Sequence, residues 1–70
     1  MTSPVNAPPA EFRAQIARLG LSQLGAARLL GVDGRTVRRW AIGEREVPET
    51  VLRLLTACER HPDLVAELSD

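Results

Sequence analysis

Residues 33–43 of the chain read Asp33-Gly34-Arg35-Thr36-Val37-Arg38-Arg39-Trp40-Ala41-Ile42-Gly43. On a helix, which turns by about 100° per residue, the three arginines of this run fall on one face. The opposite face carries apolar side chains, namely Val37, Trp40 and Ala41. Asp33 is a favoured N-cap residue and Gly43 a favoured terminator, so the run predicts a short helix over about 33–42. The basic outer face of such a helix is suited to contact a polyanion.

The residues before this run predict another short helix. Ser22 is a favoured N-cap, and an apolar pattern continues from it to Gly31, where a left-handed backbone is easiest for glycine. We therefore expect a helix over about 22–30, joined by a tight glycine turn to the basic helix at 33–42. Two short helices in this order, the second one basic, are typical of a helix-turn-helix that reads DNA in the major groove.

The rest of the chain predicts further helices. An apolar repeat at i, i+4 and i+7 (Phe12, Ile16, Leu19) indicates a helix after the proline pair at residues 8 and 9. Proline and acidic residues indicate two C-terminal helices at about 48–60 and 62–68. Residues 1–8 are expected to be a flexible tail. The prediction is one all-α domain over 9–70, a bundle of four to five short helices.

The composition of the chain limits the classes of function that we expect for it. The chain has 70 residues, 44% of them hydrophobic and one of them cysteine, which is typical of a small globular domain without a disulfide. It has no apolar run long enough for a membrane span and no signal-peptide pattern, so we expect a cytoplasmic protein. Neither a catalytic set, nor a glycine-rich phosphate loop, nor a metal-ligand spacing occurs. We expect no enzyme activity, no cofactor and no metal.

The charges are distributed unevenly, although the formal net charge is zero. Residues 10–43 carry six arginines against two acidic residues, a net charge of +4, whereas residues 44–70 carry three arginines against seven acidic residues, a net charge of −4. The first half is suited to bind phosphate. The acidic half lowers nonspecific affinity for DNA and is itself suited to dock a basic partner.

A wider set of positions resembles one known family. The set is Leu21-Ser22-Gln23, Ala27, Leu30-Gly31-Val32, Thr36-Val37, Trp40, Gly43, Val47-Pro48 and Leu54-Leu55. It resembles the helix-turn-helix family of phage Cro and C1 repressors and their bacterial relatives, over about residues 10–58. The resemblance implies a lambda-repressor-like helical bundle. It also implies a transcriptional regulator, usually a repressor, that binds double-stranded DNA as a homodimer.

The resemblance further implies roles for individual residues. Those expected to contact bases are Gly34, Arg35, Arg38 and Arg39. Those expected to contact phosphate are Gln23 and Arg45, and the matching core positions are Ala27, Val37 and Trp40. Arginine prefers the O6 and N7 atoms of guanine. Gly34 has no side chain to read a base, but it lets the backbone approach a neighbour closely.

One departure from the family concerns charge. Members often pair an arginine of the first helix with a glutamate just after the tryptophan position. Ile16 and Ala41 stand at these positions, so an apolar pair replaces the ion pair, which can be neutral for stability. The exchange is expected to remove a charge near the phosphate surface.

Several alternatives remain open at this stage. The arginines of 33–42 would otherwise be a solvated helix face, Gln23 a simple helix-start residue and Trp40 a stacking platform. The arginines at 13, 18 and 28 are expected to serve solubility or salt bridges. The last helix either folds back over Leu52 or forms a dimer interface with helix 48–60. For function, the alternative is a protein-interaction module or an antitoxin, which binds a partner through its acidic C-terminal half.

Overall fold

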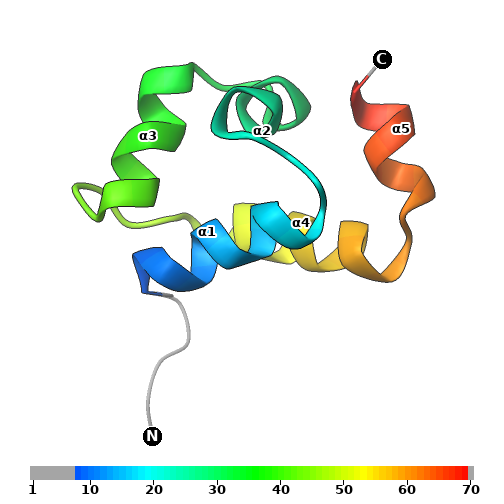
Figure 1. Ribbon diagram of the computed structural model, residues 1–70, viewed down its shortest axis with the longest axis horizontal. Helices are drawn as coiled ribbons and strands as arrows, with labels where there is room; N and C mark the ends of the chain where they lie inside the picture. Colours follow the sequence, from blue (N-terminus) through cyan, green and yellow to red (C-terminus); the bar gives the residue numbers. More distant parts are fainter. Residues whose placement is uncertain (1–7, 70) are drawn as a thin grey trace, which may run out of the picture.

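The computed structural model describes residues 8–69 of the chain (Figure 1). Within this part it contains helices and no strand, which confirms the predicted all-α bundle. The helices are α1 (Pro9–Arg18), α2 (Gln23–Leu30), α3 (Gly34–Ile42), α4 (Glu49–Arg60) and α5 (Asp63–Ser69). The predicted tail at 1–8 lies outside the described residues, except for Pro8.

The helices enclose a single core. α3 packs against α1 and α2, and α4 packs against α1. Figure 1 shows α1 and α4 along the lower side of the bundle, with α3 and α5 at opposite ends. α5 folds back onto α2 and α4. Leu52 packs against the core cluster, so both C-terminal helices contribute to the bundle itself, and a dimer interface on them stays a prediction.

The aromatic pair of the chain lies at the centre of this core. Phe12 of α1 is fully buried and Trp40 of α3 is 5% exposed. Their rings meet edge to face, with 5.9 Å between centroids and an interplanar angle of 85°, an arrangement that adds to the free energy of apolar burial. Val37 and Leu55 fill the space around them without solvent exposure. The interpretation of Trp40 as a core residue is therefore confirmed.

Side-chain caps begin the two central helices. The Ser22 hydroxyl accepts a hydrogen bond from the Gly25 amide at 2.9 Å, and the Asp33 carboxylate accepts one from the Arg35 amide at 2.8 Å. Each bond satisfies a donor that has no partner within the helix. A Cβ on residue 25 would stand 3.3 Å from the Ser22 hydroxyl, so the glycine there leaves room for the cap. Both caps agree with the sequence prediction.

Left-handed glycines end the same two helices. Gly31 has a φ of 72° and Gly43 a φ of 86°. The amide of Val32 then bonds the Ala27 carbonyl at 3.0 Å, and that of Glu44 bonds the Arg39 carbonyl at 2.9 Å. These bonds reverse the chain tightly at both points. The first reversal sets α3 against α2, and the second leads toward α4.

Alanine at the two turns is expected to destabilise the protein to different extents. Gly31→Ala should lower the free energy of unfolding by about 1–2 kcal/mol, because a left-handed backbone is costly for a residue with a Cβ. Gly43→Ala should cost more, since its Cβ would also stand 3.0 Å from Pro9 Cγ, whereas nothing lies within 4 Å at Gly31. Urea denaturation of both variants measures the difference. Equal losses would show that the contact with Pro9 has no energetic weight.

Candidate nucleic-acid interface

The exposed face of α3 carries all three of its arginines. Arg35, Arg38 and Arg39 are exposed, while Val37, Trp40 and Ala41 are buried on the other side. At about 100° per residue, Arg39 lies about 40° to one side of Arg35 and Arg38 about 60° to the other. Arg35 is thus on the centre line of the exposed face, opposite the core, and the other two arginines flank it.

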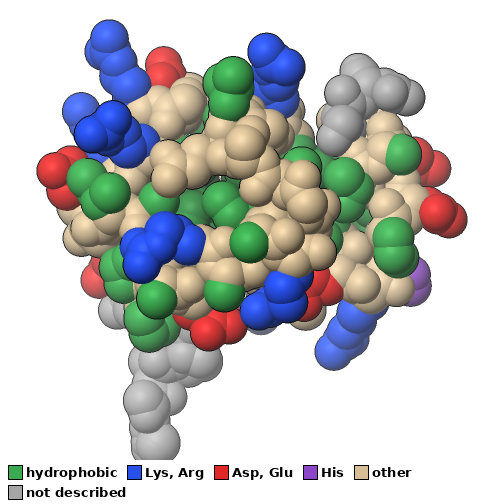
Figure 2. All heavy atoms as spheres, in the orientation of Figure 1, with side chains coloured by type: hydrophobic (Ala, Val, Ile, Leu, Met, Phe, Trp, Pro, Cys, Tyr) green, Lys and Arg blue, Asp and Glu red, His purple; other side chains and the backbone are tan. Residues whose placement is uncertain are grey.

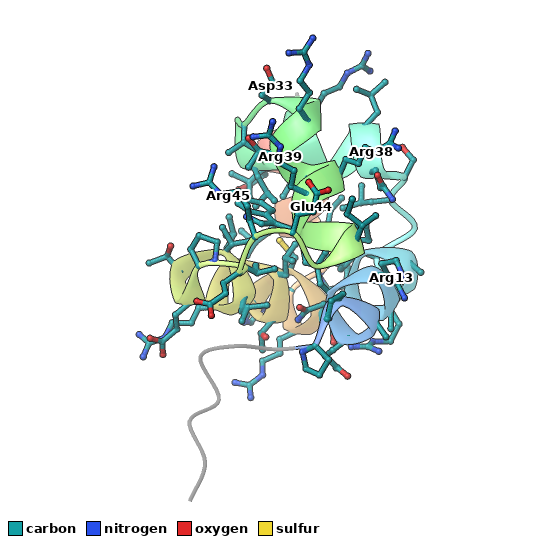
Figure 3. The ribbon with its side chains drawn as sticks, turned by 90° about the vertical axis from the view of Figure 1, so that its left-hand side faces the viewer. Arg13, Asp33, Arg38, Arg39, Glu44 and Arg45 are labelled. Atoms are coloured by element: carbon teal, nitrogen blue, oxygen red, sulfur yellow. The ribbon has the colours of Figure 1, made fainter. Side chains whose placement is uncertain are left out.

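The flanking arginines point to different sides of α3. Figure 3 shows Arg39 and Arg45 on one side of the helix and Arg38 on the other, nearer α2. Arg45 follows α3 in the loop that begins at Gly43, and it is exposed. The structure therefore brings Arg39 and Arg45 together on one flank. If α3 lay in the groove of a rod-shaped polyanion, one guanidinium group would face each wall of the groove and one would face its floor.

The arginines of α3 have no ion-pair partner within the described part of the chain. The ion pairs there join Arg18 to Glu59 at 3.1 Å and to Glu11 at 3.9 Å, and Arg53 to Glu49 at 3.2 Å. They lie on α1 and α4, away from α3. The expectation that Arg18 forms salt bridges is confirmed, whereas the guanidinium groups of α3 remain available to an outside anion.

Arg13 occupies a place that the sequence did not indicate. Its Nη1 donates a hydrogen bond to the carbonyl oxygen of Ala41, in the last turn of α3. That carbonyl lacks a partner within the helix, and a cation is favourable at this end of a helix. Ile16 and Ala41 are buried as an apolar pair. Arg13 thus places a guanidinium group beside this apolar pair, and the loss of a charge near the phosphate surface through the exchange stays a prediction.

The remaining candidate site residues, Gln23 and Gly34, are the first residues of α2 and α3. Gln23 begins α2 and is exposed. Gly34 begins α3, and no atom lies within 4 Å of the place where its Cβ would be. The sequence predicts that Gly34 allows close approach of a neighbour, and no other element of residues 8–69 makes this approach. The space beside it is open to an outside molecule.

Basic and acidic side chains both occur at the α3 end of the bundle. Figure 2 shows several arginine side chains over this end, with acidic side chains beside them, further arginines along the lower side, and acidic side chains over α5 at the other end. At the α3 end, Asp33 is engaged as the helix cap. Glu44 lies next to Arg45 in the following loop (Figure 3). The exposed arginines of α3 and Arg45 make this end of the bundle a candidate surface for an anion.

The structure also bears on a metal site, a reactive thiol and a membrane span within residues 8–69. No three histidine, cysteine or acidic residues come together there as a metal site would require. Cys58 is fully buried, and burial raises the pKa of its thiol, which keeps it protonated. No helix in this part of the chain is long and apolar enough to cross a membrane.

Comparison with known proteins does not place the chain in a family. The chain matches no protein-family model, no curated protein and no solved structure.

Proposed function

We propose that this protein is a sequence-specific, double-stranded DNA-binding transcriptional regulator of the Cro/C1 type, acting in the cytoplasm as a homodimeric repressor. One observation carries the proposal. α3 presents three exposed arginines on one face, without a carboxylate partner in the described chain, while its other face is anchored in the core. A helix preceded by a short capped helix and a tight glycine turn has the form that enters a major groove.

The arginines of α3 occupy different positions around the helix, so we expect them to make different contacts with DNA. Arg35, on the centre line, reaches the floor of the groove, where a bidentate contact to guanine O6 and N7 is favoured. Arg38 and Arg39 lie on the flanks, toward the two groove walls, within reach of base edges or phosphates. Gln23 and Arg45 lie outside the groove as phosphate contacts. The open space at Gly34 lets a base or a sugar approach the helix backbone.

The proposal includes a homodimer, because a single α3 offers too small a contact with DNA for tight, specific binding. One α3 covers few base pairs, and the net charge of zero gives little nonspecific attraction. Two copies related by a two-fold axis would read half-sites about 34 Å apart, one helical turn of DNA. Binding of such a dimer over a promoter excludes the transcription machinery sterically.

Salt dependence tests the proposal. Affinity for a labelled duplex should fall steeply as salt rises from about 50 to 200 mM, because bound phosphates release counterions. Arg45→Ala should weaken binding to all duplexes alike and reduce the slope of log affinity against log salt by about one unit for each lost contact. Fluorescence anisotropy at four salt concentrations measures both. Binding that is insensitive to salt would contradict the proposal.

Gly34→Ala separates folding from DNA binding. Alanine is a better helix former by up to about 1 kcal/mol, and its Cβ has room, so the variant should be more stable toward urea. The same methyl group would occupy the space proposed for DNA, so affinity for a specific duplex should fall. A stabilised variant with unchanged affinity would show that DNA does not approach this residue.

A further inference from the structure

Ile42, the last residue of α3, is a large apolar residue left in solvent. Its side chain is 53% exposed, although the core lies directly beneath its neighbour Ala41. Seven residues after Arg35, it returns to within about 20° of the same line along the helix. The centre of the exposed face of α3 therefore carries two side chains, a guanidinium group in the first turn and a branched alkyl group in the last.

The backbone around Ile42 is held in place. Arg13 bonds the carbonyl oxygen of the preceding residue, and the Gly43 turn lies against Pro9. Ile42 is thus presented at a defined position, with more than half of its side chain open to solvent.

We propose that Ile42 is a second specificity-determining residue of α3, which contacts the 5-methyl group of a thymine. The proposal rests on the proposed function of α3 in the major groove. In that groove thymine is the one base that presents a methyl group. An isoleucine placed against the polar edge of another base would remove water from its donors and acceptors without supplying a hydrogen-bond partner. The chemistry of the side chain therefore selects one base.

The length of α3 sets the spacing of the two contacts. Seven residues at 1.5 Å per residue place Ile42 about 10 Å from Arg35 along the helix axis. Successive bases of a strand rise by about 3.4 Å. The thymine therefore lies about three base pairs from the guanine contacted by Arg35.

Removal of single methyl groups from DNA tests this directly. A duplex enriched by the protein from a random library is remade with deoxyuridine in place of thymine, one position at a time. For the unaltered protein, one substitution at the expected spacing should weaken binding about fourfold, the value of one buried methyl group. For Ile42→Ala the same substitution should have a much smaller effect, because three of the four side-chain carbons are gone.

A matched control removes an exposed apolar side chain elsewhere. Leu68 is 42% exposed, and its helix, α5, lies at the end of the bundle opposite α3 (Figure 1). Leu68→Ala should keep the full response to deoxyuridine. Equal responses in the unaltered protein and in Ile42→Ala would overturn the inference, as would an enriched site without thymine at this spacing. The proposed function would survive both results. It fails separately if no duplex is enriched or bound.

Discussion

Trp40→Ala is expected to remove a large part of the free energy of unfolding of the protein. Truncation of a buried tryptophan costs about 3–5 kcal/mol, because it removes apolar contacts and leaves a cavity. In this chain it would also remove the edge-to-face contact with Phe12 at 5.9 Å. A domain of 70 residues has a total stability of about 4–10 kcal/mol. The loss is therefore comparable with the whole free energy of folding.

Circular dichroism at 222 nm during urea denaturation measures this effect without relying on tryptophan fluorescence. Trp40→Phe is the control, since it keeps a ring in the core and should lose much less stability. A Trp40→Ala variant that unfolds at the same urea concentration as the unaltered protein would contradict the placement of this side chain at the centre of the core.

Arg35→Ala is expected to weaken binding to the preferred duplex by about 1–3 kcal/mol, or roughly 5- to 150-fold. The reason is its place on the centre line of α3, where it has no ion-pair partner in the described chain and faces away from the core. Affinity for unrelated duplexes should fall less. Anisotropy titrations with the preferred duplex and with single-base variants measure both the loss of affinity and the loss of base discrimination.

Arg53→Ala provides the matched control. Arg53 is also an exposed arginine on a helix, but it lies on α4 and pairs with Glu49. Its removal changes the net charge by the same amount and should leave base discrimination intact. If Arg35→Ala kept the full preference for its guanine, the assignment of base contact to Arg35 would be wrong.

The helices and their ends could be predicted from the sequence because their signals are local. The Ser22 and Asp33 caps act within three residues, and the glycine turns at Gly31 and Gly43 act on the adjacent helix end. The face of α3 that carries the arginines follows from periodicity alone. These features needed no knowledge of how the helices pack.

Other features depend on packing between distant residues and could not be predicted in this way. Arg13 reaches a carbonyl group 28 residues away, and no spacing rule relates the two. The free space at Gly34 depends on what other helices leave empty. The exposure of Ile42 had a signal in its i+7 spacing from Arg35. The same periodicity places Ala41 on the apolar face, so this exposure, unlike the other two features, could have been predicted from the sequence.

Selection from a random duplex library by the purified protein tests the central claim most directly, with the affinity for the enriched duplex measured at two salt concentrations. We predict an enriched two-fold motif that contains guanine in each half-site and whose binding falls steeply as salt rises. The absence of enrichment, with weak and unselective binding, would contradict the claim. The acidic C-terminal half and a basic protein partner would then be the place to look for function.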